Sequence, residues 1–162
     1  MSKAFGIGFA AAALVVIIVI WIGLAETKGN HLAPTGWISN VRVQSIAERE
    51  TMMVIDFGIL NDADVPMTVA RIDPWITTRS GEDIHGTLFA GADMEKTFAF
   101  YPALGPQVNR TMPLRTVIDR HKTLHRMVAV EFDTPAQVVQ SRKGVTLHIE
   151  DATGPFLDLT AK

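Results

Sequence analysis

The sequence predicts a mainly β protein, in which a single N-terminal transmembrane helix is followed by an antiparallel β-sandwich domain. Two observations predict this fold class. An uncharged apolar run extends from Ala4 to Ala25, and after it short alternating apolar and polar segments recur between turn-forming residues. The length of 162 residues suits one domain. We therefore expect an anchor at residues 1–25, a linker at 26–36 and an extracytoplasmic domain at 37–162.

The anchor is predicted from the run Ala4–Ala25, which lacks charged residues, Asn, Gln and Pro. As a helix it would extend about 33 Å, enough for a hydrocarbon core of about 30 Å. A cleaved signal peptide is the alternative, because Gly23 and Ala25 are small, but signal peptides usually have a shorter apolar region of about 7–15 residues. We expect a single-pass protein of the cell (inner) membrane, with its N-terminus cytoplasmic and its domain periplasmic.

The predicted helix also offers a surface for packing against other helices. Gly6 with Ala10, and Gly8 with Ala12, form pairs of small residues at a spacing of four, which permits close helix approach in lipid. Trp21 lies where an indole favours the membrane interface. Because the run contains no ionisable residue, it has no ligand for haem or chlorophyll. We expect no cofactor, and as partners the lipid bilayer and other transmembrane subunits.

After the linker, strands are predicted wherever apolar residues alternate with polar ones. Asn and Asp side chains cap local backbone, so Asn61–Asp64 is predicted to be a turn, as are residues 79–82 and 151–154. Pro74 predicts an edge or a bulge, because proline cannot donate to a sheet. The predicted strands lie around Val41–Val43, Met53–Ile59, Met67–Thr78, Leu88–Ala90, Thr97–Tyr101, Thr123–Asp133, Val145–Ile149 and Phe156–Leu159.

Two segments are predicted not to be strands. Residues 102–113 contain three prolines and a glycine, and are expected to form an extended loop. Pro135–Arg142 is expected to form a short helix, capped by Thr134 and ended by Gly144.

Part of this pattern resembles a known family. Residues 53–61 (MVIDFGILN), 65–72 (VPMTVARI) and the pair Ser80-Gly81 resemble the WHy domain of LEA-14-type proteins. The resemblance covers residues 41–86, although Asn61 is followed by Asp62 where the family has proline. It implies a small sandwich of the immunoglobulin or fibronectin type III kind, in a family whose bacterial members often follow a membrane anchor. A sandwich fold does not define a chemistry.

Three groups of residues are candidate sites of chemistry. His121 and His125 would share one face if residues 114–125 were helical, and could then bind a metal. Asn61–Asp64 offers oxygens for Ca²⁺, and Glu82, Asp83 and His85 could serve acid–base chemistry. Each has a plainer interpretation, as a solvated strand connection, a turn and a hairpin tip. We expect no metal site and no catalytic residues.

These expectations favour a non-catalytic accessory subunit of a larger membrane complex, such as a respiratory or photosynthetic one. The absence of cysteine excludes thiol catalysis and disulfides. Without a basic run, nucleic acid is not an expected partner. A free-standing, membrane-tethered periplasmic binding module is the alternative, and a metal-dependent enzyme using His121 and His125 is a remote one.

Overall fold

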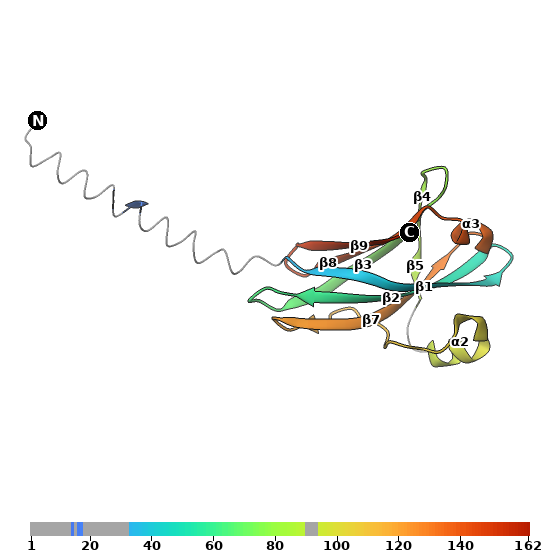
Figure 1. The fold of residues 1–162 in the computed structure, drawn as a ribbon, viewed down its shortest axis with the longest axis horizontal. Coiled ribbons are helices and arrows are strands. Elements are labelled where there is room, and N and C mark those ends of the chain that lie inside the picture. Colours follow the sequence, from blue (N-terminus) through green and yellow to red (C-terminus); the bar gives the residue numbers. More distant parts are fainter. Residues whose placement is uncertain (1–13, 15, 18–32, 90–93) are drawn as a thin grey trace, which may run out of the picture.

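The computed structural model describes residues 14, 16–17, 33–89 and 94–162 (Figure 1). Most of the predicted anchor and linker lies outside these residues, as do the predicted packing residues Gly6, Gly8, Ala10, Ala12 and Trp21. Within the described ranges, no helix is both long and apolar enough to cross a membrane. The transmembrane anchor therefore stays a prediction.

The described chain from Thr35 onward forms two antiparallel sheets that pack face to face (Figure 1). This confirms the predicted mainly β, antiparallel sandwich. The first sheet has the order β1 (Thr35–Ala47), β2 (Glu50–Asn61), β7 (Lys122–Phe132) and β5 (Thr87–Leu88). The second has the order β4 (Asp83–His85), β3 (Met67–Thr77), β8 (Gly144–Asp151) and β9 (Phe156–Ala161), with β6 (Val117–Ile118) paired to the start of β3.

The core lies between the two sheets and follows from the alternation seen in the sequence. On β8, Val145, Leu147 and Ile149 are buried while the residues between them are only partly so. Because successive side chains on a strand point to opposite faces, each strand contributes every second residue to the core. The members from the first sheet include Met53, Ile55, Phe57, Ile59, Val128, Val130 and Phe132, and those from the second include Ile72, Ile76, Val145, Leu147, Ile149 and Leu159.

The chain crosses from the second sheet to the first between β4 and β5, at Gly86. A Cβ atom on Gly86 would lie 2.2 Å from Val130 Cγ1 and 2.8 Å from the Phe132 ring, so only glycine fits this crossing. The amide of Gly86 donates a hydrogen bond to the carbonyl of Pro74. The nitrogen of Pro74, which has no hydrogen to donate, therefore faces β4, whose pairing with β3 covers only Trp75–Thr77. At Pro74 this side of β3 is an edge, as the proline predicts.

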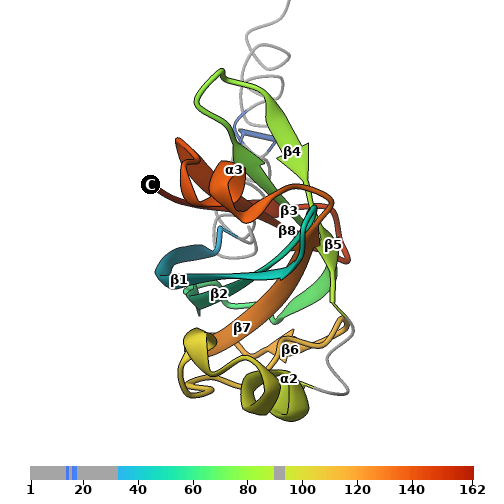
Figure 2. The same cartoon turned by 90° about the vertical axis from the view of Figure 1, so that its right-hand side faces the viewer.

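Part of the outer face of the first sheet, around Met52, Val54, Met127 and Ala129, is covered by the segment of residues 94–109, which we call the covering segment (Figure 2). It begins with helix α2 (Met94–Phe100) and the 3₁₀ helix η2 (Pro102–Leu104). The predicted strand at Thr97–Tyr101 is therefore wrong. Met94 and Phe98 are the buried residues of α2, and their spacing of four is helical rather than alternating.

Two other local predictions are corrected. Helix α3 (Ala136–Gln140) is confirmed, but Pro135 rather than Thr134 occupies its N-cap, and the Thr134 carbonyl accepts a hydrogen bond from the Thr51 hydroxyl. The C-cap is Ser141, so Gly144 begins β8 instead of ending the helix.

Candidate functional site

The two histidines proposed as a metal pair do not share a site. Residues 114–125 are not helical, because β6 and the start of β7 occupy them. His125 is exposed on β7 and packs edge-on against Trp37, with 5.7 Å between ring centroids. His121 lies in the turn before β7 with a φ of 56°. A helix would have brought the two rings to one face, whereas His121 precedes the strand that carries His125, and residues four apart in an extended chain are separated by about 13 Å.

His121 instead contacts the predicted turn at Asn61–Asp64. Its Nε2 lies 3.0 Å from Asp64 Oδ1, and its Nδ1 lies 3.8 Å from Asp62 Oδ1. Asn61 is buried and organises this turn, because its Oδ1 accepts from the Ala63 amide and its Nδ2 donates to the carbonyls of Val65 and Ile118. Among the described residues, no three or more His, Cys, Asp or Glu side chains are arranged to hold a metal ion.

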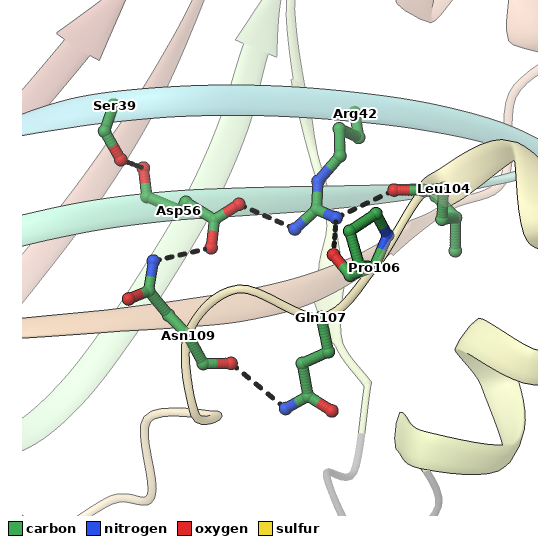
Figure 3. A network of polar contacts seen from close by, with 7 residues as sticks. All are labelled: Ser39, Arg42, Asp56, Leu104, Pro106, Gln107 and Asn109. Atoms are coloured by element: carbon green, nitrogen blue, oxygen red, sulfur yellow. Dashed lines mark hydrogen bonds and ion pairs between the residues drawn. The ribbon is translucent and has the colours of Figure 1, made fainter.

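A buried ion pair lies beneath the covering segment (Figure 3). Arg42 on β1 donates from Nη2 to Asp56 Oδ2 on β2 at 2.6 Å, and the carboxylate side chain is only 3% exposed. Asp56 points to the outer face, on the side of β2 opposite the core residues Ile55 and Phe57, and the covering segment buries it.

Arg42 and Asp56 also hold the covering segment in place (Figure 3). The Nη1 atom of Arg42 donates to the carbonyls of Leu104 and Pro106 at 2.7 and 2.8 Å. The Asn109 amide donates to Asp56 Oδ1 at 2.9 Å, and the guanidinium lies 5.1 Å from the centre of the Phe98 ring. The pair is thus a structural clamp that holds the covering segment on the first sheet.

An apolar cavity of about 380 Å³ lies beside β5, between Leu88–Phe89, the β7 residues Val128–Ala129 and residues 111–114. None of its lining residues is titratable. The residues that line the cavity therefore offer no general acid or base.

The outer face of the second sheet, formed by β4, β3, β8 and β9, differs from the first; we call it the open face. Its side chains on β3 and β8 are mostly half-buried, and those on β4 and β9 are exposed. Four rings form a row across its strands, which we call the ring row. Successive centroids lie 5.5 Å apart from His85 to Trp75, 6.3 Å from Trp75 to His148 and 5.0 Å from His148 to Phe156.

Carboxylates flank the ring row on the open face. Asp73 Oδ1 lies 3.2 Å from His85 Nδ1, and Asp158 Oδ1 lies 2.6 Å from His148 Nδ1. Each imidazole is thereby oriented by a carboxylate on a neighbouring strand. The predicted site residue His85 belongs to this face, and so does Asp83, which accepts a hydrogen bond from the Thr77 hydroxyl at 2.7 Å.

Two groups in the described chain have shifted pKa values. Burial would raise the pKa of Asp151, but hydrogen bonds from the Thr153 side chain and from the amides of Thr153, Thr68 and Ala152 outweigh it and hold the pKa below its usual value. Burial lowers the pKa of Arg142, which donates to the Val139 carbonyl. Asp151 organises the β8–β9 turn, so its role is structural.

Sequence reasoning missed both the clamp and the ring row. The clamp joins residues far apart in the chain, so no local sequence pattern predicts it. The members of the ring row do occupy outward positions of correctly predicted alternations, at Trp75, His148 and Phe156. The missing information was the strand order, which brings these positions together.

No known family model matches the chain, and no curated protein matches its sequence. Solved structures with a similar arrangement include an uncharacterized β-sandwich protein from Clostridium difficile 630, with a TM-score of 0.37, 13% identity and coverage of 82% of each chain. The archaellum periplasmic stator protein FlaG from Sulfolobus acidocaldarius has a TM-score of 0.38 and 7% identity, over 80% of this chain and 100% of the other. At these TM-scores the similarities support no inference about function.

Proposed function

We propose that this protein is a non-catalytic accessory subunit of a larger membrane complex, anchored by residues 4–25 with its sandwich outside the cytoplasm. The observation that carries the proposal is the difference between the two outer faces. The chain covers part of the first sheet with its own residues and holds the cover with a buried ion pair. On the second sheet, the ring row keeps His85 and Phe156 exposed and Trp75 and His148 half-buried.

An accessible row of rings is suited to protein contact. Aromatic side chains supply large contact areas with little loss of conformational freedom, and they dominate the energetics of interfaces. Phe156 is 61% exposed at the edge of the row, which exposes apolar area that a partner would remove from water. The flanking carboxylates supply the polar rim that interfaces usually have.

The order of the strands supports the finer description of the fold. Strands β1, β2, β7 and β5 correspond to an A-B-E-D sheet, and β4, β3, β8 and β9 to a C′-C-F-G sheet, which is the immunoglobulin-type arrangement. The proposed likeness to WHy and fibronectin type III sandwiches is compatible with this order. In such folds the binding surface is a feature of the particular chain rather than of the family.

A native gel of gently solubilised membranes tests the proposal. We expect the wild-type chain to migrate in a complex well above the monomer mass, and Phe156→Ser to reduce that fraction by about tenfold, as the loss of an interface aromatic does. Phe100→Ser is the matched control, because Phe100 is 76% exposed on α2, away from the open face. Migration of the wild type at the monomer mass would contradict the subunit proposal and favour a free-standing tethered module.

A further inference from the structure

We infer that the partner of the open face is a protein segment that presents arginine or lysine side chains. This inference rests on the proposed function and adds the chemistry of the partner. Within the four strands of the open face, the outward positions carry four carboxylates and one cationic side chain. The carboxylates are those of Asp73, Asp83, Glu150 and Asp158, and the cation is Arg71.

The single cation of this face is already engaged. Arg71 Nη2 lies 3.3 Å from Asp73 Oδ2, on its own strand. Among the described residues, Asp158 and Asp83 form no ion pair with a lysine or arginine, since their contacts are with His148 and Thr77. Glu150 lies opposite Arg71 in the register, but the ion pair of Arg71 is with Asp73. The face therefore has an excess of negative charge, and complementarity favours a positively charged partner.

The rings of the ring row also favour a positively charged partner, for a reason that does not depend on the carboxylates. A guanidinium or ammonium group is attracted to the face of an aromatic ring, and tryptophan is the strongest such acceptor. Trp75 lies at the centre of the ring row, and Asp73 lies two residues before it on the same outward side of β3. A basic side chain on this face can thus contact a ring and a carboxylate together, and a guanidinium is suited to both contacts.

The register of the strands shapes the surface that a partner meets. Trp75 lies directly opposite His85, but its contact with His148 is diagonal, because Trp75 pairs with Thr146. His148 contacts Phe156 diagonally as well, since Phe156 pairs with Glu150. The ring row therefore runs obliquely across the sheet with Asp73 and Asp158 beside it. An extended segment with basic residues at every second position presents all of them to one face, which suits this surface.

Titration of the full-length protein in lipid nanodiscs with a short peptide of alternating Arg and Thr tests the inference. The readout is the indole N–H resonance of Trp75, assigned by its loss in Trp75→Phe. We expect this resonance to shift with the Arg-Thr peptide, and not with peptides of alternating Gln and Thr or Glu and Thr. Binding should weaken as salt is added, because the charges are exposed.

Charge variants supply the matched comparison. Asp73→Asn with Asp158→Asn should weaken binding of the Arg-Thr peptide about three- to tenfold, as expected for two exposed charge contacts. Glu48→Gln with Glu50→Gln removes the same charge from the exposed β1–β2 hairpin and should leave the affinity unchanged. Both double variants should keep the wild-type circular dichroism spectrum, which separates a binding effect from loss of the fold.

Several results would overturn the inference. Equal shifts with the Gln-Thr peptide, or unchanged binding in the Asp73→Asn, Asp158→Asn variant, would show that charge does not select the partner. If the indole resonance of Trp75 shifts with a chitin oligosaccharide and not with the Arg-Thr peptide, the open face binds glycans instead of a basic protein segment. Concentration-dependent shifts without peptide would make the occupant a second copy of the chain. If the complex that depends on Phe156 persists but the Arg-Thr peptide does not bind, the inference about charge is wrong and the proposed function is not affected. If the peptide binds but the wild-type chain migrates as a monomer, the subunit proposal is wrong and the inference about charge is not affected.

Discussion

At the scale of single residues, the Arg42–Asp56 pair is the most consequential interaction of the described chain. Its carboxylate is 3% exposed and its guanidinium side chain 14% exposed, so both charges are largely removed from water. Such a pair needs further hydrogen bonds to offset the cost of desolvation. Here they come from the Asn109 amide to the carboxylate and from the guanidinium to two carbonyls of the covering segment.

The first prediction concerns this pair. Asp56→Ala should lower the free energy of unfolding by about 3 kcal/mol, because it leaves a buried guanidinium without its counter-charge. Chemical unfolding of the full-length protein, followed by near-ultraviolet circular dichroism, measures the change. Asp73→Ala, which disrupts an exposed pair, should change it by no more than about 0.5 kcal/mol. Similar losses in the two variants would show that the clamp contributes no more than a surface pair.

The second prediction concerns Asp151, whose pKa is lowered in the folded chain. A lowered folded pKa means that the unfolded chain binds the proton more readily, so the carboxylate stabilises the fold above its unfolded pKa. That contribution is lost as pH falls through the folded pKa. The difference in unfolding free energy between wild type and Asp151→Asn should be constant near neutral pH and shrink below about pH 4. A difference that does not change with pH would contradict this assignment.

The limits of sequence reasoning at this scale are physical. Asn61 could be predicted to organise a turn, because its partner Ala63 lies two residues away and the chemistry is local. Asp56 could be placed on the correct face by alternation, yet its burial depends on a segment about fifty residues later. The four rings were equally visible in the sequence, but their contact requires the strand order.

At the scale of elements, the strands were predicted well because each buries one face and alternates. The covering segment was not, since residues 97–101 alternate aromatic and small residues by chance while Met94 and Phe98 supply the true helical spacing. Strand β2 shows the consequence: it is buried on both faces, toward the core and toward the covering segment. Alternation distinguishes the two faces of β2, but it cannot show that the outer face is buried as well.

The third prediction concerns the crossing between β4 and β5. Gly86→Ala should destabilise the fold by about 1–3 kcal/mol, because the new methyl group overlaps Val130 and Phe132. Adding Val130→Ala removes the nearest of these atoms, so the double variant should be more stable than the sum of the two single changes predicts. Thermal unfolding of the four proteins measures this coupling. Strict additivity would mean that Gly86 is not constrained by Val130.

At the scale of the whole molecule, the two sheets have different roles. The first sheet is partly covered on its outer side by the chain itself. The second has exposed rings at both ends of the ring row and an excess of carboxylates, which is why we propose it as the surface for a partner. An anchor at residues 4–25 would restrict that surface to one side of a membrane. A weak contact at the open face is then reinforced by any contact made within the lipid, since tethering raises the effective concentration.

The fourth prediction concerns the predicted packing surface of the N-terminal helix. Gly8→Leu should weaken assembly, because a large side chain blocks close approach of another helix at a small-residue pair. The unfolding transition of the sandwich should not move, since the sandwich is built from Thr35 onward. Native gels of solubilised membranes measure the assembled fraction, and Ile7→Leu serves as the control that alters the same helix without filling a small-residue position.

If Gly8→Leu lowers the assembled fraction as Phe156→Ser does, both the helix and the open face contribute to one assembly. If Gly8→Leu co-migrates with the complex as fully as wild type, the helix is an anchor only and the open face alone must hold the partner.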